Sequence, residues 1–111
     1  MISFPEVKTD AFEARVLKAA QPVIVQFTND GCGLCKILAP ALADVAREYE
    51  GEIEVVSVDT DLSPDIAATY HIQSVPALLM FSDGRLRDRL LGNQPRGRLA
   101  EFIETQLGAG Q

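Results

Sequence analysis

Three short apolar runs, separated by stretches with helical periodicity, constrain the fold of this chain more than any other feature. They read VIVQF at 23–27, IEVVSVD at 53–59 and ALLMF at 77–81. Apolar runs of this length, bounded by turn residues, are typical of buried strands. A fourth strand is expected at 85–91, where charged and apolar residues alternate in RLRDRLL after the hairpin turn SDG at 82–84.

Four helical patterns surround and separate these runs. Pro22 stops the first helix, and Pro40 lies inside the second, where a proline should produce a kink. Pro64 and Pro95 stand at the first positions of the third and fourth helices, where proline is tolerated. The expected helices begin after a cap at Thr9 or Asp10, at Cys35 (ending at Tyr49, before Gly51), at Pro64 (ending near Tyr70) and at Pro95.

The order of these elements predicts an α/β fold with one central mixed sheet. Strands separated by helices are expected to form parallel crossovers, and the C-terminal hairpin adds an antiparallel pair. Helices should cover both faces of the sheet. With 111 residues and no repeat or linker, residues 1–111 are expected to form a single domain, with 108–111 as a frayed tail.

The charge balance excludes one class of function. The chain carries 16 Asp and Glu against 10 Lys and Arg, a net charge of −6. Sequence-independent binding of nucleic acid needs a field of basic side chains, so no nucleic-acid partner is expected. No apolar run approaches the ~20 residues of a membrane helix, and no signal-peptide pattern opens the chain, so we expect a cytoplasmic protein with no membrane contact.

Two cysteines, Cys32 and Cys35, stand between the first strand and the second helix. At a helix N-terminus, unpaired N–H groups and the helix dipole favour an anion, so the pKa of the Cys32 thiol should lie below its ordinary value. Cys32 is then the expected nucleophile, and Cys35, one turn further in, the resolving residue that attacks the mixed disulfide. Lys36 adds a positive charge on the same helix face.

Two other uses of the cysteine pair were weighed. Half of a zinc site needs two more ligands, and the chain offers no third cysteine and only one histidine, His71, so no metal site is expected. Two inert core cysteines are disfavoured because a junction between strand and helix is exposed. Redox chemistry is therefore the favoured interpretation.

The chain resembles the thioredoxin family over nearly its whole length. The matching segments are VIVQF, CGLCK at 32–36, Pro40, VDTD at 58–61 and SVPALLMFSDG at 74–84. The resemblance implies a thioredoxin fold, no bound cofactor, disulfide-containing proteins as substrates, electrons from NADPH through a flavin disulfide reductase, and a monomer. It also implies a cis peptide bond before a proline that faces the cysteines, and a substrate groove formed by Gly31, Val75, Pro76 and Gly92.

The motif departs from the family pattern at two positions. Thioredoxins usually read WCGPC, whereas this chain reads GCGLC, with Gly31 for tryptophan and Leu34 for proline around Gly33. Leu34 keeps a backbone N–H and a free φ, and the resemblance then implies a less reducing potential. Gly31 removes an aromatic contact beside the nucleophile, so affinity for generic targets should fall.

A third departure lies in the strand before the motif. The family usually places an Asp here, thought to relay a proton to the second cysteine, with a Lys on the next strand; this chain has Gln26 and Ser57. A glutamine exchanges no proton near neutral pH, so slower turnover is expected. We expect Gln26 and Ser57 to form a neutral hydrogen-bonded replacement.

The sequence therefore predicts a protein-disulfide reductase with altered potential and a weaker or narrower substrate range. The alternative is a thioredoxin-fold binding or chaperone-like protein with little reductase activity. A third, minor alternative is a dimer sharing an iron–sulfur cluster between two CxxC pairs. His71 is expected to be an exposed loop residue without a role. An arginine group should protect an edge strand rather than dock an acidic partner; it comprises Arg85, Arg87, Arg89, Arg96 and Arg98.

Overall fold

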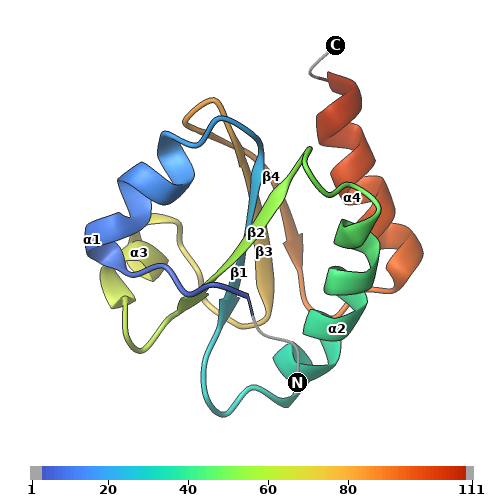
Figure 1. Cartoon of the computed structure of the whole chain (residues 1–111). Helices are drawn as coiled ribbons and strands as arrows, with labels where there is room; N and C mark the ends of the chain where they lie inside the picture. The colour runs from blue at the N-terminus through green and yellow to red at the C-terminus, as the bar shows by residue number, and fades with distance from the viewer. Residues whose placement is uncertain (1–3, 110–111) are drawn as a thin grey trace.

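A four-stranded sheet in the order β2-β1-β3-β4 forms the centre of the computed structural model, which describes residues 4–109. Figure 1 shows the sheet nearly edge-on, with helices on either side. The observed strands overlap the apolar runs and the alternating segment seen in the sequence. Their bounds are Val23–Thr28 for β1, Glu54–Asp59 for β2, Ala77–Ser82 for β3 and Arg85–Leu91 for β4.

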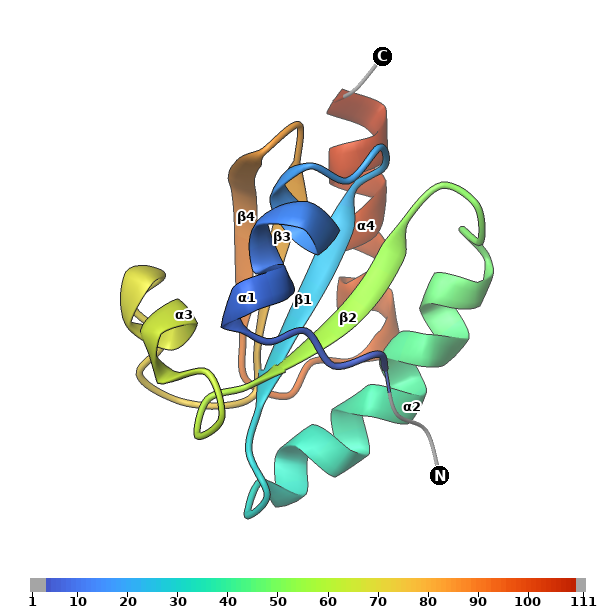
Figure 2. The ribbon, with the colours of Figure 1, turned by 60° about the vertical axis from the view of Figure 1, so that its left-hand side comes forward.

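Helices cover both faces of this sheet, which confirms the predicted thioredoxin-type architecture (Figures 1 and 2). One face carries α1 (Thr9–Phe12), its continuation as a π-helix, η1 (Glu13–Leu17), and α3 (Pro64–Thr69). The other face carries α2 (Gly33–Arg47) and α4 (Arg96–Ala109).

The direction of β3 differs from the predicted topology. β1 and β2 are parallel, with Thr28 opposite Asp59, but β3 runs antiparallel to β1, with Ala77 opposite Phe27. A parallel crossover must carry the chain back along the sheet, a distance of ~20 Å for a six-residue strand. The connection through α3, whose 6 residues make about 9 Å of helix, does not cross back along the sheet, and the chain re-enters at the end where β2 leaves it. Only one connection is therefore a parallel crossover.

Two apolar cores lie on opposite faces of the sheet, and β1 contributes to both. Its side chains alternate, so Val25 and Phe27 pack toward α1 and α3 while Ile24 packs toward α2 and α4. All five residues from 23 to 27 are buried, as expected for a central strand. The α2 side is completed by helix residues that recur at helical spacing, namely Leu38, Leu42, Val45, Leu99, Phe102 and Ile103.

The ends of the helices differ from the predicted ones. Lys8 occupies the N-cap of α1 without a side-chain hydrogen bond, so the predicted cap is wrong; the Thr9 hydroxyl instead donates to Asp65 Oδ1 at 2.6 Å. Helix α2 ends at Arg47, with Gly51 in the following turn at φ +88°. Of the predicted tail, residues 108 and 109 extend α4, while 110 and 111 lie outside the described residues.

Candidate redox site

The loop between β1 and α2 brings the first cysteine to a helix end. Asn29 shapes this loop: its carbonyl accepts from Cys32 N at 3.2 Å, and its Oδ1 accepts from Gly31 N at 3.1 Å. These bonds close the turn that places Cys32 at the N-cap of α2. The first turn of a helix has N–H groups without intrahelical partners, so an electron-rich atom is stabilised at this position.

A disulfide joins Cys32 and Cys35, whose Cα atoms lie 5.3 Å apart. The backbone N–H of Cys35 donates to Cys32 Sγ at 3.1 Å, so the first cysteine caps the helix with its sulfur. Both side chains are buried, with Cys35 only 3% exposed. A thiolate formed at Cys32 would keep this donor, which favours ionisation of the first cysteine.

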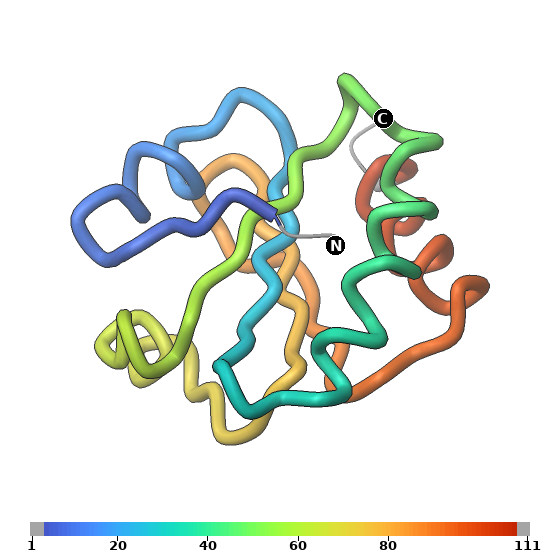
Figure 3. Tube along the Cα trace, turned by 60° about the horizontal axis from the view of Figure 1, so that its bottom comes forward, coloured from blue at the N-terminus to red at the C-terminus, as the bar shows by residue number. Residues whose placement is uncertain are grey.

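Two further segments meet the cysteine loop at the same end of the sheet. The peptide bond between Val75 and Pro76 is cis, and Pro76 is buried directly before β3. Gly92, at φ +77°, donates its N–H to the Pro76 carbonyl at 2.9 Å. Figure 3 shows the loop before α2, the segment before β3 and the segment after β4 side by side at this end of the molecule.

Gln26 lies behind the second cysteine on the face of β1 that α2 covers. It is 3% exposed, and its Nε2 donates to the backbone carbonyl of Cys35 at 3.4 Å. Ser57 stands directly beside it in the β1–β2 register. The hydrogen bond of the Gln26 amide thus goes to Cys35 and not to Ser57 as expected.

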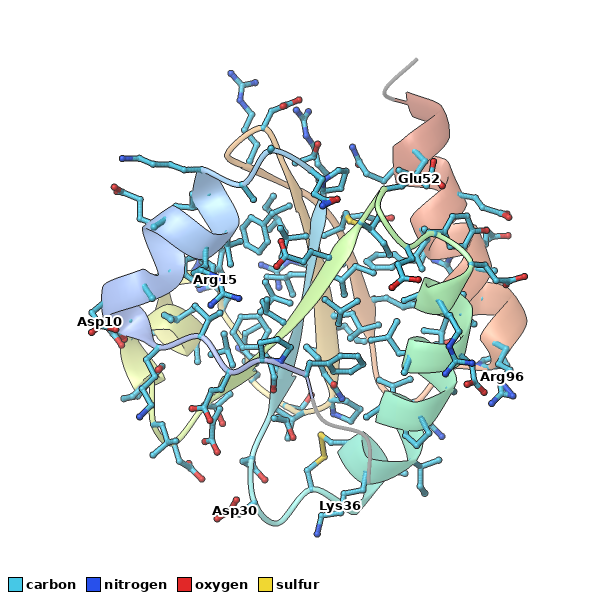
Figure 4. The ribbon with its side chains drawn as sticks, in the orientation of Figure 1. Asp10, Arg15, Asp30, Lys36, Glu52 and Arg96 are labelled. Atoms are coloured by element: carbon cyan, nitrogen blue, oxygen red, sulfur yellow. A yellow bond between two sulfur atoms is a disulfide. The ribbon has the colours of Figure 1, made fainter. Side chains whose placement is uncertain are left out.

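A cavity of about 300 Å³ opens behind Cys35, between α2 and the β1–β2 edge of the sheet. It is lined by neutral groups from β1, including Gln26, and by four charged side chains. The charged residues are Glu6, Asp30, Lys36 and Asp59. Figure 4 shows Asp30 on the loop and Lys36 on the first turn of α2, on either side of the disulfide.

Three apolar side chains are exposed near the cysteines. Leu34 is 50% exposed and Ile37 60% exposed on α2, and Leu91, at 57%, ends β4 opposite Ala77. Sequence reasoning missed Ile37 and Leu91 as site residues. Ile37 has one sequence signal, since it lies off the apolar stripe of its helix. Leu91 has none, because only sheet pairing brings it beside the start of β3.

The tryptophan position of the family motif is open space in this chain. A Cβ built on Gly31 has Asn29 Oδ1 as its nearest neighbour outside the adjoining residues, at 3.9 Å, an ordinary van der Waals distance. Gly33 has nothing within 4 Å. The surface beside Cys32 is therefore unobstructed.

Other residues singled out in the sequence are exposed or engaged in local contacts. His71 is exposed at φ +57°, in the turn that ends α3. The arginines of and after the edge strand β4 mostly have close partners: Arg87 with Asp83, Arg89 with the Tyr70 carbonyl, Arg96 with Asp44, and Arg98 with Glu101.

No group of three or more His, Cys, Asp or Glu within residues 4–109 is arranged to hold a metal ion. Over the same residues, none of the helices has the length and apolar character needed to cross a membrane.

Comparison with known proteins matches this geometry to one family. The thioredoxin family model matches residues 3–105. Thioredoxin C-2 of Corynebacterium nephridii is 42% identical over 96 residues, which are 86% of this chain and 89% of that protein. Thioredoxin 1 of Nostoc sp. is 36% identical over 107 residues, 96% of this chain and 100% of that protein. Thioredoxin of Staphylococcus aureus is 39% identical over 100 residues, 89% of this chain and 94% of that protein.

Proposed function

The chain belongs to the thioredoxin family and is a protein-disulfide oxidoreductase, and on this premise we propose that Cys32 is its nucleophile and Cys35 its resolving residue. One observation carries the assignment: Cys35 N donates to Cys32 Sγ at the N-terminus of α2. This donor stabilises a thiolate at Cys32, whereas Cys35 lies deeper. We further propose that residues 1–111 act as one domain, in the cytoplasm and as a monomer.

The reaction has two exchange steps. The Cys32 thiolate attacks one sulfur of a substrate disulfide, so a bond between Cys32 and the substrate forms, the substrate S–S bond breaks and one substrate thiolate leaves. Cys35 then loses its proton and attacks Cys32 Sγ, which forms the Cys32–Cys35 bond and releases the second substrate thiolate. Two electrons pass to the substrate, whose thiolates take up two protons.

We propose that the substrate groove consists of Gly31, Val75, Pro76 and Gly92, extended by the exposed apolar side chains beside it. Pro76 has no N–H, so an extended substrate segment would pair with the backbone of its neighbour Val75. The apolar contacts with substrate would come from Leu34, Ile37 and Leu91. In the family motif, a tryptophan at position 31 would make most of this apolar contact.

The substituted positions support an activity that is weaker or narrower than that of a typical thioredoxin. Gly31 provides no side-chain contact, Leu34 keeps its N–H and a free φ, and Gln26 exchanges no proton. We propose that the couple is less reducing than in WCGPC proteins, with Gly33 and Lys36 also tuning the motif. Electrons are proposed to come from NADPH through a thioredoxin reductase.

The test couples NADPH oxidation to reduction of a protein disulfide through thioredoxin reductase, with C32S as the matched control. Turnover by the natural chain that disappears in C32S is the expected result. The exposed apolar side chains Leu34, Ile37 and Leu91 favour a second candidate, a binding or chaperone-like protein. Absence of turnover in both chains, with binding of an unfolded protein retained in C32S, would support that candidate instead.

A further inference from the structure

One side of the cavity behind Cys35 is lined by a row of three side chains from neighbouring extended segments. Gln26 pairs with Ser57 in the β1–β2 register, and Ser57 forms a parallel bridge with Glu6. Hydrogen bonds of 2.8 Å from Val7 N to Ser57 O and from Ser57 N to Pro5 O fix this bridge. Paired residues of a parallel sheet share one face, so Glu6 lies on the cavity side, about 10 Å from Gln26 at two strand spacings.

A second carboxylate stands one row nearer the end of the sheet that carries the cysteines. Asp59 is half-buried, pairs with Thr28 in the same register and lines the same cavity. Its Oδ1 accepts from Asp61 N at 2.8 Å and from Leu62 N at 3.3 Å. These two bonds hold the carboxylate in place at the cavity wall.

The chemistry of the second exchange step requires a proton acceptor at this position. Cys35 must become a thiolate before it attacks Cys32, and its side chain is 3% exposed. Gln26 is the buried polar group next to it, and an amide accepts no proton near neutral pH. The cavity of about 300 Å³ has room for water between Cys35 and the charged residues that line it.

The charged residues that line this cavity are Glu6, Asp59, Asp30 and Lys36. The charged ammonium group of Lys36 is only a hydrogen-bond donor, so it cannot accept the proton of the Cys35 thiol. Asp30 sits at the exposed tip of the loop before Cys32 and points outward in Figure 4. Glu6 is also exposed, but it lines the cavity together with the half-buried Asp59 on the sheet side opposite α2, in rows that include Gln26 and Thr28.

We propose that Glu6 and Asp59 act as proton acceptors for Cys35 through water in this cavity, in place of a buried carboxylate at position 26. The inference rests on the proposed function. The Cys35 proton passes to water and on to a carboxylate as Cys35 Sγ attacks Cys32 Sγ; the Cys32–Cys35 bond forms, the bond from Cys32 to the substrate breaks, and the departing thiolate is protonated. Both carboxylates would act through intervening water, and neither is proposed to touch the reacting sulfur atoms.

The test separates the two exchange steps in E6Q, D59N and the double variant, with D61N as the matched control. Single-turnover release of the second substrate thiol, from the mixed disulfide with Cys32, measures resolution by Cys35. The same substitutions placed in C35S measure the first attack by Cys32. We expect resolution in the double variant to slow about tenfold at pH 6.5, while D61N and the first attack are unchanged. This loss is smaller than the ~100-fold or more typical of general-base catalysis, because bulk water remains as an acceptor.

The pH profile distinguishes proton transfer from a structural effect. The loss in the double variant should shrink toward zero as the pH rises above the pKa of the Cys35 thiol, because the thiol then ionises unaided. The same loss should be absent in a Q26D background, where a carboxylate already stands beside Cys35. Rescue by high pH together with rescue by Q26D supports the proposal.

Three outcomes overturn it. Equal resolution rates in the natural chain and the double variant at every pH contradict the inference alone, as does a loss that does not vary with pH. A C35S chain that traps no mixed disulfide with substrate contradicts the proposed function itself. Urea unfolding of each variant shows whether the fold is retained, and D59N keeps an oxygen to accept from Asp61 N.

Discussion

Gln26 Nε2 donates to the backbone carbonyl of Cys35 at 3.4 Å, so a neutral amide on β1 ties the second cysteine to the sheet. Both side chains are 3% exposed. Burying a carboxylate at this position costs several kcal/mol unless it is paired, and Ser57 on the next strand brings no positive charge. The amide therefore holds Cys35 in place but leaves its proton without a buried acceptor.

Replacing Gln26 by Asp should raise the rate of insulin disulfide reduction by about tenfold near neutral pH, because a buried carboxylate can take the Cys35 proton. Turbidity of precipitating insulin chains measures the rate. Q26N is the control, since it has the size of Asp without its acid–base chemistry. A rate for Q26D that is equal to or below that of Q26N contradicts the prediction.

Replacing Leu34 by Pro should make the couple more reducing by about 30 mV, equivalent to ~1.4 kcal/mol for two electrons. Leu34 lies at the second position of α2, where its N–H has no intrahelical partner, so proline fits the helix. Equilibration with glutathione, followed by thiol alkylation, gives the potential. L34A tests loss of the side chain alone, and an equal shift in L34A would rule out the backbone effect.

Replacing Gly31 by Trp should lower the KM for a protein disulfide about fivefold while leaving kcat nearly unchanged, as expected for an added apolar anchor. A Cβ at this position meets only Asn29 Oδ1, at 3.9 Å, so a side chain can be attached without a clash at its first atom. Steady-state kinetics with insulin measure both constants. G31A adds a Cβ without an aromatic surface, and the same fall in KM with G31A would show that the ring is not the cause.

The Tyr49 hydroxyl should titrate at a higher pH than the hydroxyl of an ordinary tyrosine. Its hydroxyl donates to Glu104 Oε2 at 2.6 Å, and this hydrogen bond, with burial and nearby carboxylates, raises the pKa of Tyr49 to about 12. Burial also raises the pKa of Tyr70, so the titration is made in Y70F, where Tyr49 is the remaining tyrosine. Ultraviolet absorbance should place the Tyr49 midpoint near pH 12, and E104Q should lower it.

The sign of the stability effect follows from the raised pKa. Below pH 10 the Tyr49 hydroxyl keeps its proton in both the folded and the unfolded chain. The stabilisation of the folded chain by the hydrogen bond to Glu104 is then fully present. Between pH 10 and 12 only the unfolded chain releases the proton, and stability falls as pH rises. Urea unfolding should show this fall in Y70F and a smaller one in Y70F/E104Q; equal slopes would contradict the assignment.

Replacing Phe81 by Ala should lower the free energy of unfolding by about 3–5 kcal/mol. The ring packs edge-on against Phe12 at 5.7 Å and Tyr70 at 5.1 Å between ring centroids, and it links α1, α3 and β3. Urea unfolding followed by circular dichroism measures the change. Leu62→Ala, at an exposed position, should cost less than about 0.5 kcal/mol, and comparable losses in both variants would contradict the assignment of Phe81 to the core.

Local sequence patterns were sufficient to predict the main helices and strands and the position of the cysteine pair between a strand and a helix. The apolar run before Cys32 predicts a buried strand, and the apolar residues after Cys35 recur at helical spacing, so the motif's place at a strand-to-helix junction follows from sequence. The predicted mixed sheet with helices on both faces is confirmed. These features depend on side-chain periodicity within a few turns, which the sequence records directly.

The tertiary structure decided what depends on backbone pairing between distant segments. The pairing of β3 with β1 shows that β3 is antiparallel. Pairing within the sheet brings Leu91 beside the start of β3, and the bridge to Ser57 places Glu6 on the cavity behind Cys35. No local pattern marks Glu6 or Leu91, because strand order and register arise from long-range hydrogen bonds and packing. The cysteine pair that can exchange disulfides is visible in the sequence, whereas the groups that surround it are brought together only by the fold.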